Sequence, residues 1–232
     1  MKRIAGDVDV LDVTHGIPPR DVRAGALALA NALPYLPVGV HVAVVDPGVG
    51  SERRGVAIET GDGRVHVGPD NGLLLFGAER LSGIARAVEL VNDEFFLSPV
   101  SRTFHGRDVF CSVAAHVASG VPLERLGPRV AADDLRRLEI PSAELEGPGI
   151  RATVIGVDRF GNVQLNVREA ALGRSIDVAG RAIRVGGTFA DVPEGELVVF
   201  EDSFGWLAIA ENGGSASETL GLGRGDPVTL SW

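Results

Sequence analysis

The arrangement of apolar runs changes near residue 142, and this change constrains the fold more than any other feature of the chain. Before it, strand-like segments such as Val8–His15 and Val38–Val45 alternate with helix-like segments. The helix-like segments have helical spacing of apolar residues and good helix formers, and they are Arg20–Leu33, Asn71–Arg80 and Asp108–Ala118. The alternation predicts an N-terminal α/β/α layered domain, residues 1–142, with a mostly parallel sheet.

A different pattern follows residue 142. Residues 143–149 (AELEGPG) are typical of a linker. From residue 150 to residue 232, short apolar runs alternate with turns, and Ser215–Leu220 carries only a weak helix signal. This spacing predicts a C-terminal domain that is a small β-barrel or β-sandwich.

Composition narrows the class of partner. The chain has 232 residues, 45% of them apolar, which is enough for one large core or two modest ones. Its net charge of −9 argues against nucleic-acid binding, and no apolar run approaches the roughly 20 residues of a membrane helix. Lys2 is the only lysine, so the glycine loops lack the lysine of a phosphate-binding loop. Cys111 is the only cysteine, and with no signal-like N-terminus we expect a cytoplasmic protein. The loop Val44–Gly55 and the segment Phe104–Asp108 are interpreted as the two halves of a small-molecule site.

The stretch Val44–Gly55, VVDPGVGSERRG, ends an apolar run on an acid and continues into a glycine-rich turn. Asp46 stands at the carboxyl end of an expected parallel strand, where α/β sheets bind their ligands. Arg53 could fold back over the loop toward Asp46. The alternative is an ordinary strand-to-helix turn with a loop ion pair of little energetic weight.

The second candidate segment is Phe104–Asp108, FHGRD. His105 lies just before an expected helix, Gly106 permits close approach of a ligand, and a helix start attracts anionic groups. The other histidines are interpreted as structural, and none of them forms a pair with metal-ligand spacing: His15, His41, His66 and His116. Since Cys111 is also isolated, we expect no zinc or iron site.

Polar residues also gather in the C-terminal region. The segment DRFGN places Asp158, Phe160 and Asn162 close together. An aromatic ring flanked by an acid and an amide suits a polar ligand with an aromatic part, although a β-hairpin explains part of the pattern. Asn71, in GPDNG, can likewise be a simple turn residue.

The motifs taken in order are more specific than any one of them. They are DVTHGIPPRDVRAGALAL, VVDPGVGSERR, GPDNG, TFHGRDVF, DRFGNVQLN and NGGSASETLGLGRGD. This ordered set resembles the S-adenosylmethionine hydroxide adenosyltransferase family, relatives of the fluorinase and chlorinase enzymes. The resemblance covers nearly the whole chain.

The resemblance implies an N-terminal α/β/α domain and a C-terminal β-barrel. It also implies a homotrimer that converts S-adenosylmethionine and water to adenosine and L-methionine. Its active sites would lie between the N-terminal domain of one subunit and the C-terminal domain of the next, without a cofactor or a metal. The implied catalytic residues are Asp46, Arg53 and His105, and either Asp46 or His105 can be the base. The implied substrate-binding residues are Asn71, Phe104, Gly106, Asp158 for the methionine ammonium, Ser203 for its carboxylate, Asn162 and Gly213 for adenine, and Phe160 packing nearby.

Two comparisons with the family pattern refine this expectation. Halogenating relatives carry an apolar or aromatic residue at the position of Asp46 and a halide-binding hydroxyl at that of Gly106, so this chain is expected to use water. Family members also carry a segment before the position of Met1 that supplies a first strand and a ribose-binding aspartate. Either the start codon is misassigned or the chain is truncated. A truncated chain would favour the alternative, a non-catalytic binder of adenosine or S-adenosylmethionine, whereas the retained Asp46, Arg53 and His105 favour catalysis.

Overall fold

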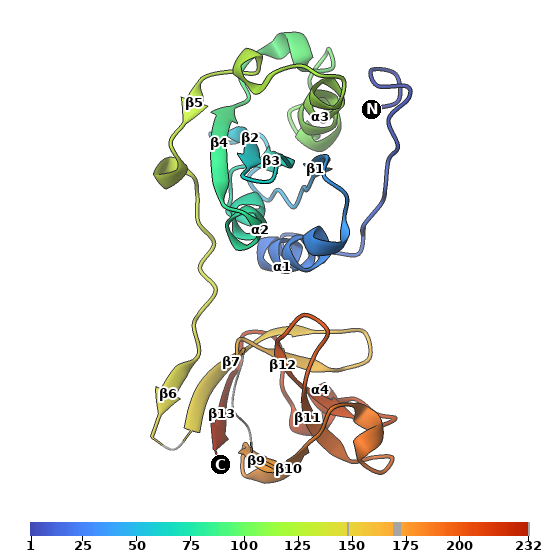
Figure 1. Ribbon diagram of the computed structural model, residues 1–232, viewed down its shortest axis with the longest axis vertical. Coiled ribbons are helices and arrows are strands. Elements are labelled where there is room, and N and C mark those ends of the chain that lie inside the picture. The colour runs from blue at the N-terminus through green and yellow to red at the C-terminus, as the bar shows by residue number, and fades with distance from the viewer. Residues whose placement is uncertain (148, 169–172, 232) are drawn as a thin grey trace. The chain divides into compact units, whose positions relative to one another are not determined.

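Figure 1 shows the computed structural model of the chain, which describes residues 1–147, 149–168 and 173–231. The chain divides into two compact units, Met1–Leu138 and Glu139–Trp232. The first combines helices with a five-stranded sheet, and the second is built mainly of strands. The expected mixed α/β class is therefore confirmed. Across the described ranges, every helix is too short or too polar to span a lipid bilayer.

The sheet of the first unit is mixed, so the prediction of a mostly parallel sheet is wrong. Its strand order is β1-β3-β2-β4-β5, and among the described pairings β1–β3 alone is parallel. The cause is the turn at 61–63, which folds β2 directly back onto β3 and leaves no room for a crossover helix. The strands are β1 (Val40–Val42), β2 (Gly55–Thr60), β3 (Val65–Pro69), β4 (Ile84–Glu89) and β5 (Arg129–Val130).

Helices cover both faces of this sheet, which gives the expected layers (Figure 1). Val56 and Ile58 of β2 pack into one core with residues of α1 and α2, whereas Ala57 packs into another with residues of α3. The three helices predicted from the sequence are all present. They are α1 (Val22–Ala32), followed by η1 (Leu33–Tyr35), then α2 (Leu73–Leu81) and α3 (Cys111–Ala118), which continues from a π-helical turn, η3 (Gly106–Phe110). Short 3₁₀ turns complete the unit: η2 (Asp93–Phe95), η4 (Leu123–Arg125) and η5 (Ala132–Asp134).

The expected strand at Val8–His15 is not formed. Residues 8–14 have no sheet partner in the described part of the chain, and Val10, Leu11 and Val13 are 48%, 65% and 51% exposed. An alternating apolar pattern is compatible with a strand, but a strand forms only where its backbone N–H and C=O groups bond to a neighbouring strand. The neighbouring prediction, Val38–Val45, is confirmed in part, because only β1 within it is paired.

The second unit is the expected barrel. Its strand order is β13-β9-β10-β11-β12-β8-β7-β6, and the additional pairing of β13 with β7 closes a seven-stranded ring. Aliphatic side chains such as Val163, Ile176 and Leu230 fill its core. The elements are β6 (Glu144–Glu146), β7 (Gly149–Val157), β8 (Val163–Leu165), β9 (Ser175–Val178), β10 (Arg181–Val185), η6 (Phe189–Asp191), β11 (Leu197–Glu201), β12 (Leu207–Glu211), α4 (Ala216–Leu220) and β13 (Pro227–Ser231). Strand β6 lies within the stretch expected to be a linker.

Two histidines are built into the sheet of the first unit. His41 and His66 are register partners on β1 and β3, and their rings stack with centroids 5.3 Å apart. His66 is fully buried, and neither of its ring nitrogens has a hydrogen-bond partner among the described residues. Burial lowers the pKa of His66 from its ordinary 6.5 to about 4, and repulsion from His41 adds to the effect. Both histidines thus pack within the sheet, as the sequence-based interpretation of them as structural residues expects.

This burial predicts how stability depends on pH. Between about pH 6.5 and about pH 4, the unfolded chain binds a proton at His66 that the folded chain does not, so the free energy of unfolding falls as the pH drops through that window. We expect the wild-type chain to lose about 2 kcal/mol between about pH 7 and about pH 5 from this group. His66→Leu should remove that part of the loss. Urea unfolding followed by helical circular dichroism, which reports mainly the first unit, measures it; equal pH slopes in both proteins would contradict this account.

Candidate active site

The end of β1 leads directly into the first candidate loop. Asn71 donates from Nδ2 to the backbone oxygen of Val45 at 2.8 Å, and its Oδ1 accepts from the backbone N–H of Leu73. Asn71 thereby fastens the segment that carries Asp46 to the start of α2. Beyond Asp46 the chain turns tightly, because the backbone N–H of Val49 donates to the backbone oxygen of Asp46 at 3.3 Å.

Asp46 and Arg53 form a two-pronged ion pair across this turn. Arg53 donates from Nε to Oδ1 of Asp46 at 3.1 Å and from Nη2 to Oδ2 at 2.6 Å. Their side chains are only 10% (Arg53) and 6% (Asp46) exposed. The fold-back of Arg53 over the loop, which the sequence leaves open, is what the structure contains. A planar guanidinium meeting a carboxylate at two points fixes the orientation of both groups.

His105 joins this pair from a distant part of the chain. Its Nδ1 lies 3.3 Å from Nη2 of Arg53. A guanidinium has donors only, so Nδ1 must be the acceptor, and in a neutral ring the proton is then on Nε2. A protonated ring would lose this hydrogen bond and place two cations in contact. The three residues nominated as catalytic are therefore joined through one guanidinium.

A buried carboxylate anchors the loop that carries His105. Asp108 accepts from the backbone N–H of Ser101 at 2.8 Å and from the Arg107 side chain, and it is almost completely buried. The Arg107 guanidinium first, and the Ser101 N–H second, lower the pKa of Asp108 below its usual range. An ionised Asp108 thus closes the segment from Ser101 to Asp108 into a fixed loop.

The two loops meet at a glycine. Gly50 has φ +78°, and a Cβ built there would lie 2.7 Å from the backbone oxygen of Arg102. Both the backbone conformation and the close approach require glycine at this position. A similar but looser approach occurs at Gly106, where a Cβ would be 3.5 Å from Val44. These contacts bring the His105 loop against the Asp46 loop.

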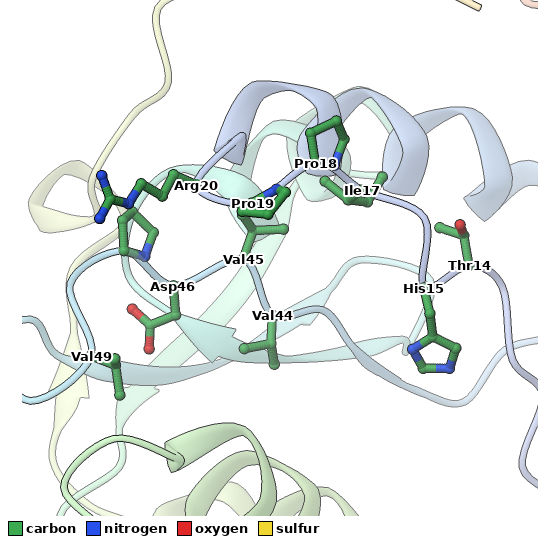
Figure 2. A pocket seen from close by; sticks show the side chains of 11 residues that line it. Thr14, His15, Ile17, Pro18, Pro19, Arg20, Val44, Val45, Asp46 and Val49 are labelled. Atoms are coloured by element: carbon green, nitrogen blue, oxygen red, sulfur yellow. The ribbon is translucent and has the colours of Figure 1, made fainter. Parts of the chain in front are cut away.

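A pocket of about 500 Å³ lies beside Asp46 (Figure 2). Such a volume is within the range of small-molecule sites. In Figure 2 the Asp46 carboxylate and the His15 ring lie well apart, with Val44 and Val45 between them in this view. The lining residues are Thr14, His15, Ile17, Pro18, Pro19, Arg20, Val44, Val45, Asp46, Pro47 and Val49. Of these, Thr14, His15 and Arg20 are polar residues that the sequence did not assign to a site. His15, expected to be structural, is instead exposed and lines the pocket.

The remaining candidates are placed as follows. Phe104 is exposed, and the Arg107 guanidinium lies over its ring, with Cζ 4.8 Å from the ring centroid. In the second unit, Oδ1 of Asp158 accepts from the N–H groups of Phe160 and Asn162, and Oδ2 accepts from Nδ2 of Asn162 at 2.8 Å. The structure thus brings these three residues into one turn between β7 and β8.

Gly213 and Ser203 occupy different ends of the barrel strands. The backbone oxygen of Gly161 accepts from the N–H of Ser217 at 2.9 Å, which holds the β7–β8 turn near the segment that contains Gly213. Ser203 lies in the β11–β12 turn, and the next strand begins at Leu207, whose N–H bonds to Val167 beyond the end of β8. The register therefore places Ser203 at the opposite end of β8 from Asp158.

No group of three or more His, Cys, Asp or Glu side chains within residues 1–147, 149–168 and 173–231 is arranged to hold a metal ion.

The sequence did not indicate one residue that lies near the site. Phe110 presents its ring to the Arg53 guanidinium, with Cζ 5.2 Å from the ring centroid. Helical spacing alone assigns Phe110 to the core, and nothing in the pattern distinguishes it from other core residues.

Known proteins resemble this chain in sequence and structure. Residues 1–127 match the family model of the SAM hydroxide adenosyltransferase N-terminal domain, and residues 152–229 match that of the C-terminal domain. An (R)-S-adenosyl-L-methionine hydrolase of Salinispora tropica is 49% identical, over 100% of this chain and 89% of that protein. An (R)-S-adenosyl-L-methionine hydrolase of Thermus thermophilus is 44% identical, over 95% of this chain and 87% of that protein. A fluorinase of Actinopolyspora mzabensis is 27% identical, over 100% and 90%.

A solved structure of an uncharacterized conserved protein from Thermotoga maritima has a TM-score of 0.89 and 35% identity, and covers 100% of this chain and 92% of its own. The solved structure of a conserved hypothetical protein from Thermus thermophilus has a TM-score of 0.80 and 44% sequence identity. The match covers 99% of this chain and 91% of that protein's chain.

The contact between the two loops predicts a specific sensitivity at Gly50. Gly50→Ala would suffer both the left-handed φ and the clash with the Arg102 carbonyl, whereas Gly83→Ala has φ +72° but open space around its Cβ. We expect Gly83→Ala to lower the free energy of unfolding by about 1 kcal/mol and Gly50→Ala to lower it by clearly more. Urea unfolding of the two variants compares them. Equal losses would contradict the tight contact.

Proposed function

The chain belongs to the SAM hydroxide adenosyltransferase family, and from that premise we propose that it hydrolyses S-adenosyl-L-methionine to adenosine and L-methionine. The ordered motifs indicate this family, and both family models match. Relatives that are 49% and 44% identical over nearly the whole chain are named (R)-S-adenosyl-L-methionine hydrolases. The substrate is S-adenosyl-L-methionine itself.

One structural observation carries the proposal most directly. The Arg53 guanidinium bonds to both the Asp46 carboxylate and the His105 ring, and Asp46 lines a pocket of suitable volume. A structural ion pair has no need of a histidine acceptor on the same guanidinium. A site that handles a polar nucleophile does need an acceptor and donors fixed around one point.

The chemistry requires an activated water. The ribose 5′-carbon of the substrate carries a sulfonium, so its leaving group, the methionine thioether, departs as a neutral molecule. Water has a pKa of about 15.7 and is a weak nucleophile at neutral pH. In the proposed step, the water oxygen forms a bond to the 5′-carbon while the carbon–sulfur bond breaks and its electron pair goes to sulfur. The water must lose one proton as this happens.

The hydrogen bonds support one division of the catalytic roles that the sequence leaves open. Nδ1 of His105 already accepts from Arg53, so the neutral ring offers only the Nε2–H donor. Asp46 is thus the group of the three that can still accept a proton from water, through the lone pairs that Arg53 leaves unused. We assign Asp46 as the acceptor that orients and deprotonates the water, and Arg53 and His105 as donors that stabilise the developing hydroxide.

The finer assignments stay proposals based on the family resemblance. By the resemblance, Asp158 is assigned to the ammonium, and Asn162 with the Gly213 backbone to adenine. The resemblance also assigns Ser203 to the carboxylate, but Ser203 lies at the opposite end of β8 from Asp158, so the register of one chain does not support that contact. Asn71, Phe104, Gly106 and Phe160 complete the proposed substrate set. A homotrimeric assembly, a cytoplasmic location and catalysis without a cofactor remain predictions.

Isotope labelling tests the reaction and its position of attack. The protein is incubated with S-adenosyl-L-methionine in water enriched in the heavy oxygen isotope. The adenosine released should carry one heavy oxygen, at its 5′-hydroxyl, and the methionine should be unlabelled. Mass spectrometry of both products measures this. Asp46→Ala should lose turnover, and added fluoride or chloride should leave adenosine as the product. Binding without turnover would support the non-catalytic alternative and contradict the proposal.

The double role of Arg53 predicts that lysine cannot replace it. Arg53→Lys keeps the charge but cannot hold Asp46 at two points and His105 at a third, so kcat should fall about a hundredfold or more with little change in KM. Arg54→Lys is the matched control, because Arg54 makes a similar pair with the buried Asp70 at 3.1 and 2.7 Å. Steady-state kinetics compare the two variants. An Arg53→Lys enzyme as active as Arg54→Lys would refute the assignment.

A further inference from the structure

The Arg53 guanidinium has a third neighbour besides Asp46 and His105. Its Cζ lies over the ring of Phe110, 5.2 Å from the centroid, and Phe110 is completely buried. The face of an aromatic ring attracts a cation, and the attraction is stronger where water is excluded. Arg53 is itself only 10% exposed. The ring therefore adds both an attractive surface and a barrier to water on that side of the guanidinium.

The contact depends on an uncommon backbone turn. His105 and Phe110 are five residues apart. His105 directly precedes the π-helical turn η3, Phe110 ends it, and the Cys111 N–H bonds to the backbone oxygen of Gly106. In an α-helix, residues five apart are rotated by about 140° from each other. The wider π turn brings positions five apart toward the same face. His105 and Phe110 can thus both reach Arg53 from one turn.

The Phe110 ring also packs closely against the backbone of β2. Gly55, at the start of β2, has no side chain, and a Cβ built there would lie 2.9 Å from Cε1 of Phe110. A Cβ at the same place would lie 3.5 Å from Cδ1 of Leu90, so the ring and Leu90 fill the space together. The ring is therefore fixed between the sheet and the guanidinium.

We propose that Phe110 is a positioning residue for catalysis, which holds the Arg53 guanidinium where it can bond to Asp46 and His105 at once. The π-helical turn is the device that makes this possible, since it places the ring and the imidazole on the same arginine. This inference rests on the proposed function for its kinetic consequence. Its structural consequence, an immobilised guanidinium, stands without it.

The test compares two buried phenylalanines. Phe95 lies in the same core cluster as Phe110, and its ring also lies near an arginine, with Cζ of Arg125 at 5.1 Å, but that arginine pairs with Glu94. Phe110→Leu and Phe95→Leu each remove one buried ring and one cation contact. Both should lower the free energy of unfolding to a similar extent, so differences in kinetics report position and not stability.

We expect Phe110→Leu to lower kcat with S-adenosyl-L-methionine about tenfold and to leave KM within about twofold, and Phe95→Leu to leave both nearly unchanged. A merely structural role for Phe110 would give the two variants the same kcat, and a role in substrate binding would raise KM instead. Either result would overturn the inference. If Phe110→Leu does not fold, Phe110→Met and Phe95→Met, which fill the volume with a flexible side chain, make the same comparison.

A second readout separates this inference from the proposed function. In the wild-type protein, the side-chain N–H signals of Arg53 should be resolved by nuclear magnetic resonance and should exchange slowly with water. In Phe110→Leu they should exchange at least about tenfold faster, and in Phe95→Leu they should not change. If the wild-type protein makes no adenosine but these signals behave as expected, the function fails and the positioning role survives. Unchanged Arg53 signals in Phe110→Leu would refute the positioning role itself.

Discussion

The site depends on how one guanidinium distributes its donors. Arg53 is nearly buried, always charged and unable to accept a hydrogen bond, so every polar partner it has must be an acceptor. Asp46 supplies two oxygens and His105 supplies one ring nitrogen. This requirement fixes the tautomer of His105 and leaves Asp46 as the remaining proton acceptor. The proposed division of catalytic roles rests on this hydrogen-bond geometry, before any substrate is considered.

The surrounding structure keeps this arrangement in place by contacts that leave little freedom. Asn71 fastens the segment after β1, Asp108 closes the His105 loop, and Gly50 allows the two loops to touch. A buried ion pair stabilises a fold little by itself, because desolvation offsets most of the attraction between its charges. Its value here is orientation, and the chain uses loops anchored to a rigid sheet to supply it.

Much of this could be predicted, and the failures have physical causes. Asp46 and Arg53 are seven residues apart across a glycine turn, so their pairing was foreseeable, whereas His105 is 52 residues from Arg53 and only the family resemblance joined them. The turn at 61–63 should have indicated a hairpin and thus a mixed sheet. The alternation of Val8–His15 could not reveal that its backbone lacks a partner. The contact of Phe110 with Arg53 could not be predicted, because a π turn leaves no recognisable pattern in the spacing of apolar residues.

The protonation of His105 is the most direct measure of the central claim, that Arg53 unites the three side chains. Nitrogen chemical shifts of the His105 ring in the wild-type protein near neutral pH distinguish a bare ring nitrogen from a protonated one. The account predicts an unprotonated Nδ1 and a protonated Nε2. A proton found on Nδ1, in either the neutral or the charged ring, would mean that Arg53 does not donate to His105 and would contradict the account.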